Sequence, residues 1–211
     1  MPTSAKTFNS EMEQLLQTYI VKGMKRFLDV GAGAAKYGKM LNSLRDEYGA
    51  QKNFEGIRIA AVEPNWDYSY DYDLEAIYDD LFHSTIEEFI NLYPSKCHDV
   101  VIFGDILEHL PKSVGISVLE FFLYRSSFII VVVPKMLIQF DKDNLLENHN
   151  SYWTEADFLK YNPVILDKKH KMMVQMRGFL RRKEAVIQEA SYDIMKRQGC
   201  SSFLGIIVEK E

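Results

Sequence analysis

Short apolar runs alternate with amphipathic segments along most of the chain. Runs rich in apolar residues predict strands at residues 26–30, 57–62, 81–84, 99–103, 128–133, 171–177 and 203–208. Segments with apolar residues three or four positions apart predict helices near residues 10–22, 35–48, 113–124, 154–161 and 183–196, and a further helix that begins at residue 85. This alternation predicts an α/β fold with a mainly parallel sheet and helices on both faces.

The same pattern predicts one domain over residues 1–211, because it contains no internal repeat, low-complexity tract or linker. Residues 1–24 form an N-terminal helical extension in this prediction. Residues 136–153 are polar and only weakly periodic, so they predict a long loop. Long loops inside compact domains are usually functional, and we therefore expect an active-site loop here.

Composition narrows the class of protein. Hydrophobic residues make up 47% of the chain and charged residues 26%, as in ordinary globular proteins. No apolar run approaches the roughly 20 residues that span a bilayer, and the N-terminus has no signal-peptide core. These features favour a soluble cytoplasmic protein. A net charge of −5 gives no general attraction to nucleic acid, so none is expected as a partner, nor is a membrane.

Cysteine and histidine spacing predicts no metal. The two cysteines lie far apart in sequence, and the five histidines form neither HxH nor HExxH patterns. The basic cluster between residues 168 and 183 is most simply a solvated face, with a patch for an acidic substrate as the alternative.

The chemistry of the chain centres on residues 27–38, which read FLDVGAGAAKYG. An apolar strand runs into Gly31 and Gly33, and a helix follows. Glycines at such a turn allow close approach of a ligand, and the helix N-terminus favours polar or anionic groups. Lys36 stands where the dinucleotide fingerprint GxGxxG requires its third glycine, so pyrophosphate binding is disfavoured.

Other predicted strands end in polar residues at the same edge of the sheet. Glu63 ends the second strand, where a carboxylate can accept hydrogen bonds from both hydroxyls of a ribose. The fourth strand is followed by Asp105, Glu108 and His109. Ligands of such sheets bind beyond the carboxyl ends of the strands, so these side chains are candidates for a site.

The turn DVGAGAAKYG resembles the first motif of the class I S-adenosylmethionine (SAM)-dependent methyltransferases. Residues 62–65 (VEPN) resemble the second motif of that family, and residues 99–111 (DVVIFGDILEHLP) resemble its fourth-strand motif. Residues 129–134 and 203–208 resemble its fifth and last strands. The resemblance implies a Rossmann-like, doubly wound, seven-stranded sheet, mostly parallel with an antiparallel last strand.

The resemblance also assigns roles to residues. Gly31 and Gly33 would lie against the methionine part of SAM, Glu63 would hold the ribose hydroxyls, and Asp105 would face the methionine end or the methyl acceptor. The full set of cofactor-binding residues that it implies is Asp29, Gly31, Ala32, Gly33, Glu63, Pro64, Thr85, Ile86 and Asp105.

The acceptor is less defined. Residues 139–153 resemble a loop found in members of the family that modify sugars or cell-envelope glycans, which implies a small-molecule or glycan-type acceptor. A hydroxyl or ammonium acceptor needs a general base, and His109, His149 and Asp105 are the candidate catalytic residues at the ligand end of the sheet.

Two alternatives stay open at this point. A non-catalytic module would bind the cofactor through the same turn and acid without transferring a methyl group. A nicotinamide-dependent oxidoreductase would use the same fold, although the missing third glycine argues against it.

Overall fold

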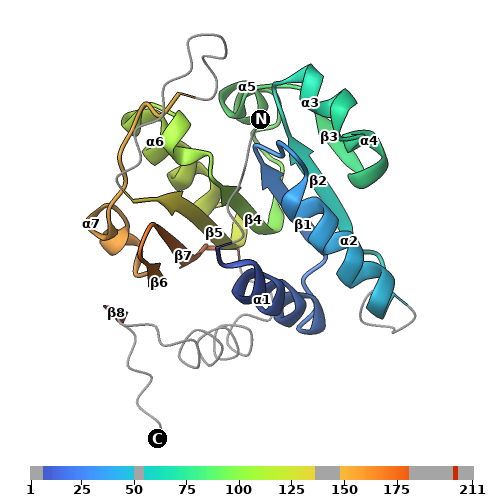
Figure 1. The fold of residues 1–211 in the computed structure, drawn as a ribbon, viewed down its shortest axis with the longest axis horizontal. Helices are drawn as coiled ribbons and strands as arrows, with labels where there is room; N and C mark the ends of the chain where they lie inside the picture. The colour runs from blue at the N-terminus through green and yellow to red at the C-terminus, as the bar shows by residue number, and fades with distance from the viewer. Residues whose placement is uncertain (1–6, 50–54, 136–147, 181–201, 204–211) are drawn as a thin grey trace, which may run out of the picture.

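The computed structural model describes residues 7–49, 55–135, 148–180 and 202–203, and shows one mixed sheet flanked by helices (Figure 1). The strands are β1 (Arg26–Val30), β2 (Arg58–Val62), β3 (Asp80–Phe82), β4 (His98–Gly104), β5 (Ser126–Pro134), β6 (Val164–Lys168), β7 (Lys171–Arg177) and β8 (Ser202–Phe203). The helices are α1 (Asn9–Val21), α2 (Lys36–Tyr48), α3 (Trp66–Asp71), α4 (Leu74–Ile77), α5 (Ile86–Leu92), α6 (Lys112–Leu123) and α7 (Glu155–Phe158), with 3-10 turns η1 (Leu107–His109) and η3 (Leu159–Tyr161).

The sheet has the strand order β3-β2-β1-β4-β5-β7-β6-β8. Strands β1 to β5 pair in parallel, whereas β7 runs antiparallel to both β5 and β6. The order reverses between β1 and β4, because β2 and β3 continue to one side and β5 to the other. Such a reversal places a ligand crevice at the carboxyl ends of the two central strands.

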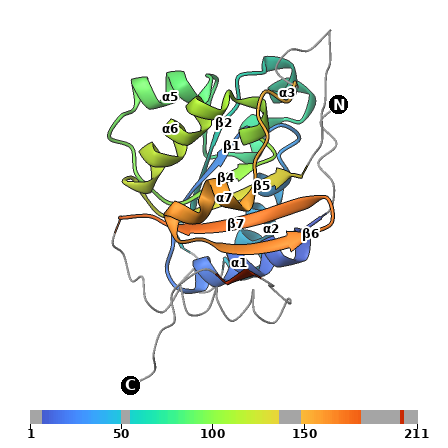
Figure 2. The ribbon, with the colours of Figure 1, turned by 90° about the vertical axis from the view of Figure 1, so that its left-hand side faces the viewer.

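Side chains of the central strands alternate between two apolar cores. Phe27 and Ile102 belong to the core that also contains α1 and α2 residues, whereas Leu28 and Phe103 belong to the core under α5 and α6. Figure 2 shows these helix pairs on opposite sides of the sheet. Alternation of this kind follows from the two-residue period of a strand, and burial on both faces explains the nearly continuous apolar runs.

The structure confirms the predicted α/β fold with a mostly parallel sheet, and it differs from the sequence prediction at the C-terminal edge. Strand β6 was not predicted; it forms a hairpin with β7, which is visible at the front of Figure 2. The strand that runs antiparallel beside β5 is β7. Ser202 and Phe203 pair antiparallel with β6, while residues 204–208 and the predicted helix at 183–196 lie outside the described residues.

The N-terminal helix α1 packs directly onto the sheet. Its residues Leu15, Leu16 and Tyr19 are fully buried, and the Tyr19 ring stacks on Phe128 of β5 with centroids 4.7 Å apart. In the part of the chain that the structure describes, no helix has the length and apolar character that crossing a bilayer requires.

Candidate functional site

The candidate site lies where β1 and β4 end side by side. Val30 is in register with Phe103 in the parallel β1–β4 pair, so the residues that follow each strand emerge next to each other. Gly31 follows β1, and Asp105 follows β4 after Gly104. The strand order reverses at this position, as the general rule for ligand sites in open α/β sheets requires.

The turn between β1 and α2 is held in a conformation that favours glycine. Gly31 has a φ of +72° and Gly33 a φ of +48°, which residues with a Cβ rarely adopt. Ala35 also has a positive φ, 57°, at the residue before α2 begins, so the last position of the turn carries backbone strain. The Gly31 N–H donates to the carbonyl of Val62 at 2.9 Å, which ties the turn to the end of β2.

Glu63 joins the turn to the second strand. Its Oε2 accepts the Gly33 N–H at 2.8 Å, and its Oε1 accepts the Asn65 N–H at 2.9 Å. The residue is only 4% exposed. Since each carboxylate oxygen has two lone pairs, each oxygen can accept a second hydrogen bond from a ligand that enters the site. Glu63 is therefore held rigidly beside the glycine turn.

Three side chains pack so closely on glycines of the site that a Cβ would collide with them. A Cβ on Gly104 would lie 1.9 Å from Tyr37 Cε2, and one on Gly38 would lie 2.4 Å from Tyr78 Cζ. A Cβ on Gly31 would lie 2.7 Å from Cδ1 of Ile106, the residue that follows Asp105. Close contact with the backbone fixes these side chains as the walls around the ends of β1 and β4.

Asp29 is the last residue but one of β1, and it is buried next to the turn. It is 1% exposed, and its Oδ2 accepts a hydrogen bond from the Tyr78 hydroxyl at 2.6 Å. Burial raises the pKa of Asp29 to about 7, the Tyr78 hydrogen bond opposes the rise, and the Glu63 carboxylate adds to it. The resemblance counts Asp29 among cofactor-binding residues; its contacts here support the turn.

The raised pKa of Asp29 predicts a pH dependence of stability. Between about pH 4 and pH 7 the folded protein keeps the Asp29 proton and the unfolded chain releases it, because the pKa rises from 3.8 to about 7 on folding. The folded state binds more protons, so its stability should fall as pH rises through this window, by about 2–4 kcal/mol from this group. The Asp29→Asn variant keeps an acceptor for the Tyr78 hydroxyl but has no proton to lose, so its free energy of unfolding should not show this decrease between about pH 4 and pH 7. Urea unfolding of both proteins at several pH values in this range measures the difference. The same pH dependence of the unfolding free energy in both proteins would contradict the raised pKa of Asp29.

Asp105 is the acid that the fourth strand presents. Its backbone has a φ of 57°, and its Oδ1 forms an ion pair with the Lys171 ammonium at 2.6 Å. Lys171 begins β7, so it reaches the site from the antiparallel edge of the sheet. Lys36 lies nearby, and its pKa is lowered by burial and by Lys171, with Asp105 opposing. The structure thus places Asp105 next to the glycine turn, where Lys171 and Lys36 partly neutralise its charge. The sequence did not associate either lysine with Asp105.

Two of the remaining predicted cofactor residues, Thr85 and Ile86, follow the next strand of the sheet, β3. Glu63 N–H donates to the Phe82 carbonyl at 3.0 Å, so the end of β3 is next to the end of β2. Thr85 accepts the Glu88 N–H at 3.2 Å and caps α5, and Ile86 is buried in the core. Ala32 is buried in the turn itself, and Pro64 follows Glu63 directly.

A further aromatic pair, Trp66 and His83, stands at the same edge of the site. Their rings stack with centroids 3.7 Å apart and an interplanar angle of 13°. Trp66 begins α3 and is largely exposed, while His83 follows β3. The two stacked rings form a flat aromatic surface beside the ends of β2 and β3.

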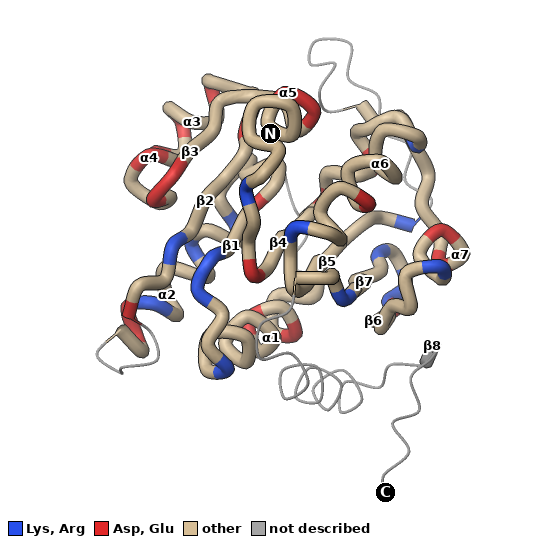
Figure 3. The backbone as a smooth tube through the Cα atoms, turned by 180° about the vertical axis from the view of Figure 1, so that it is seen from behind, with Lys and Arg blue, Asp and Glu red and all other residues tan. Residues whose placement is uncertain are grey.

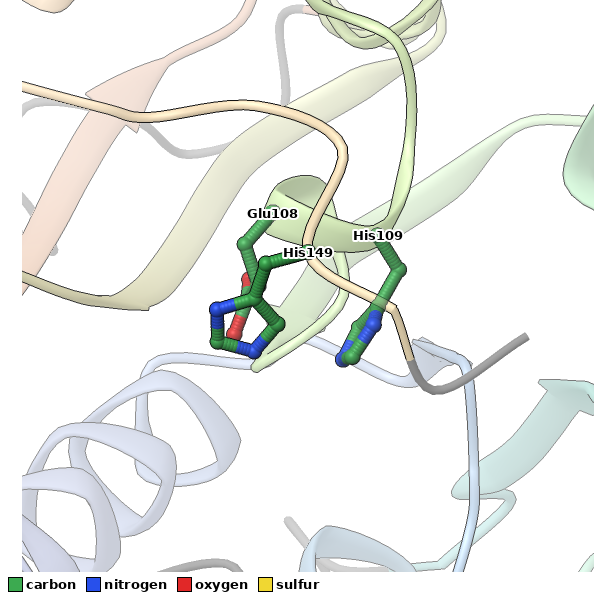
Figure 4. A group of neighbouring side chains, drawn as sticks. All are labelled: Glu108, His109 and His149. Atoms are coloured by element: carbon green, nitrogen blue, oxygen red, sulfur yellow. The ribbon is translucent and has the colours of Figure 1, made fainter. Parts of the chain in front are cut away.

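His109 and His149 come together although 40 positions separate them in the sequence. Their ring centroids are 4.9 Å apart, and with Glu108 they form one group whose ligand-capable atoms all lie within 4.8 Å of one another. Figure 4 shows the three side chains projecting into the same space, two from η1 and one from the segment that crosses it. Among the three candidate catalytic residues, the structure brings these two histidines into direct contact.

Sequence reasoning missed Tyr78 and Lys171. Tyr78 reaches Asp29 from the end of α4, and Lys171 reaches Asp105 from β7. Neither has a local signal in the sequence, because the contacts join segments 49 and 66 positions apart. Glu108 was among the site candidates that the sequence indicated, because it follows the fourth strand next to His109.

Comparison with known proteins gives a likeness in structure only. No protein-family model matches the sequence, and no curated protein matches it. One similar solved structure is the N-terminal domain of EvdMO1 with SAH bound, at a TM-score of 0.58 and 13% identity over 81% of this chain and 82% of that one. Another is a SAM-dependent methyltransferase from Archaeoglobus fulgidus, at a TM-score of 0.54 and 17% identity over 82% and 96%.

A third is the plantazolicin methyltransferase BpumL in complex with SAH, at a TM-score of 0.52 and 12% identity over 80% of this chain and 84% of that one. Identities this low establish the fold rather than the reaction. The structural likenesses confirm the expected architecture, together with the parallel strands β1 to β5, the reversal of strand order and the antiparallel β7. The chain has the Rossmann-like fold of the class I SAM-dependent methyltransferases.

Proposed function

We propose that the chain is a SAM-dependent methyltransferase that acts on a small-molecule or glycan-type acceptor. The observation that carries the proposal is the Glu63 carboxylate, held by the N–H groups of Gly33 and Asn65 at the end of β2. A rigid buried acid beside a glycine turn suits a nucleoside with two free ribose hydroxyls. Similar solved structures that contain SAH support SAM as the nucleoside.

The chain's own residues would position the two reactants. SAM supplies a methyl group already activated on a sulfonium, so alignment and exclusion of water are the main demands on the protein. Glu63 would orient the ribose, and the Gly31–Gly33 turn would place the methionine part toward Asp105. The acceptor would then lie beside Asp105 and the two histidines, where a proton can be removed from it.

The distribution of charge supports a small acceptor over nucleic acid. Lys and Arg positions lie on several elements in Figure 3, with some of them together on β6 and β7, and acidic positions concentrate on α3, α4 and β3. The net charge is −5. A nucleic-acid partner would require a basic stripe to neutralise its phosphates.

Calorimetry with SAM, SAH and NAD tests the cofactor. We expect SAM and SAH to bind and NAD to give no heat, because the turn lacks the third glycine of the dinucleotide motif. Release of SAH in the presence of hydroxylated sugars and phenols then tests turnover. Absence of SAM and SAH binding would overturn the proposal, and binding without turnover on any acceptor would favour a non-catalytic module.

His109 and His149 should be needed for turnover but not for cofactor binding. Their rings lie together next to η1, where the proposal places the acceptor, so His109→Ala and His149→Ala should each lower the turnover number by about 100- to 10,000-fold, the usual contribution of acid–base catalysis. SAH affinity should stay within about threefold of the original protein, since Glu63 and the turn are untouched. Single-turnover rates and calorimetry on the same samples measure both; a variant pair with full turnover would remove the histidines from the mechanism.

A further inference from the structure

The group of Glu108, His109 and His149 has the composition of a metal site. It offers one carboxylate and two imidazoles, and its three ligand-capable atoms lie within 4.8 Å of one another (Figure 4). Ligands of Zn²⁺ lie about 2.0–2.2 Å from the ion, so their atoms stand about 3–4 Å apart, and small side-chain rotations would close the observed spread. Two imidazoles and one carboxylate form a three-ligand set that leaves coordination positions open to a substrate.

The protonation of His109 suits a ligand role. Its Nδ1 lies 3.1 Å from the backbone carbonyl of Asn148, and a carbonyl can only accept a hydrogen bond. Nδ1 therefore carries the proton in the neutral ring, and Nε2 carries the lone pair. Metal-binding histidines are commonly oriented in this way, by a second hydrogen bond from the ring to a backbone carbonyl.

The two segments that supply the ligands are joined by backbone hydrogen bonds. The carbonyl of Glu108 accepts the N–H groups of Asn150 at 2.7 Å and Ser151 at 3.0 Å. The Asn150 side chain also donates to the His109 carbonyl at 2.7 Å, and Trp153 Nε1 donates to the Leu107 carbonyl at 3.1 Å. These bonds fix His149 beside η1 before any ligand arrives, and a preorganised set of ligands binds an ion at lower cost.

The electrostatic surroundings favour a cation. Glu108 is 3% exposed, and a buried carboxylate requires hydrogen bonds or positive charge to stay ionised. Burial raises the pKa of the Tyr37 hydroxyl, and the charges of Asp105, Asp29 and Glu108 add to the rise. A divalent ion bound to Glu108 would offset the negative charge of this buried carboxylate.

We propose that Glu108, His109 and His149 bind one divalent transition-metal ion of the Mn²⁺, Co²⁺ or Zn²⁺ class. Imidazole and carboxylate ligands suit these ions, and no thiolate is in the group. The inference reverses the prediction from sequence spacing that no metal is bound. That prediction relied on ligands close together in sequence, whereas this group combines η1 with a segment 40 positions away.

The catalytic use of the ion rests on the proposed methyltransferase function. An acceptor hydroxyl bound to the ion would have a lowered pKa, so its proton would leave to water. The oxygen would then attack the methyl carbon of SAM: a C–O bond forms, the C–S bond breaks, and its electron pair goes to sulfur, which gives SAH. The two histidines would thereby activate the acceptor through the ion rather than by taking the proton themselves.

Metal titrations of the full chain test the site directly. After treatment with a chelator, the protein should bind one Mn²⁺ per chain by electron paramagnetic resonance, and bound Co²⁺ should show visible d–d absorption. Mn²⁺ avoids binding to the cysteines, because it disfavours thiolates. Glu108→Gln and His149→Asn should weaken Mn²⁺ binding at least tenfold. His170→Gln, which alters an exposed histidine in the β6–β7 turn, is the matched control and should bind Mn²⁺ as before.

SAH calorimetry on the same samples separates this inference from the proposed function. Both variants should bind SAH normally, which also shows that they are folded. The metal site would be overturned if Mn²⁺ does not bind at millimolar concentration, or if both variants bind it as tightly as the original protein. The methyltransferase proposal would still stand in that case, provided that SAH binds. Metal binding without SAH binding would uphold the metal site and overturn the methyltransferase proposal. If both bind, turnover should fall at least tenfold after chelation and return on addition of Mn²⁺.

Discussion

Glu63→Gln should weaken SAH binding by about 100-fold or more. The two carboxylate oxygens accept N–H groups from Gly33 and Asn65, so either orientation of a glutamine amide places an NH₂ group against a backbone donor. The change also removes charge-assisted hydrogen bonds to the ribose, each about 1.5–3 kcal/mol. Isothermal titration with SAH gives the affinity, and 100-fold corresponds to about 2.7 kcal/mol.

Two further variants make the test specific. Glu63→Asp keeps the charge but shortens the side chain, so an intermediate loss is expected. Glu87→Gln removes a similar charge from an exposed position of α5 and should leave SAH affinity unchanged. Thermal unfolding without ligand shows whether each variant is folded. If Glu63→Gln binds SAH within about threefold of the original affinity, Glu63 does not bind the cofactor. The proposed function would then lose its main support.

Gly104→Ala should be among the most destabilising single substitutions near the site. The added Cβ would lie 1.9 Å from Cε2 of Tyr37, whose buried ring has little room to move. Overpacking of this kind costs about 2–3 kcal/mol, which lowers the unfolding temperature by about 4–12 °C in a chain of this length. Differential scanning calorimetry measures the shift.

The collision can be isolated by changing its partner. Tyr37→Leu removes the ring atoms that meet the new Cβ, so Gly104→Ala should cost less than about 1 kcal/mol in that background. Gly56→Ala is a useful comparison, since its Cβ would meet nothing within 4 Å and only its φ of +72° would be strained. Equal losses from Gly104→Ala with and without the Tyr37 ring would show that the contact is not the cause.

Most of the central sheet was predictable because its strands are buried on both faces. The runs at residues 26–30, 99–103 and 128–133 became β1, β4 and β5, each within a few residues of the predicted ends. Strand β6 escaped because Val164–Lys168 is short and close to the edge, with only part of it buried. Its hairpin with β7 depends on pairing rather than on an apolar pattern.

The glycine turn and Glu63 were likewise predictable, because each stands next to its strand in sequence and the fold brings strand ends together. Glu88, by contrast, closes a capping box with Thr85 and so gives that predicted cofactor residue a structural role. The active-site loop expected at residues 136–153 stays a prediction, since residues 136–147 lie outside the described residues.

By itself, the sequence determined the α/β alternation, the glycine turn and the acid at the end of the second strand, because local periodicity and turn chemistry encode these features. Only the tertiary structure decided that Lys171 pairs with Asp105 and that His149 joins Glu108 and His109. Those contacts depend on sheet pairing and on backbone hydrogen bonds between distant segments, and neither leaves a mark in the spacing of residues along the chain.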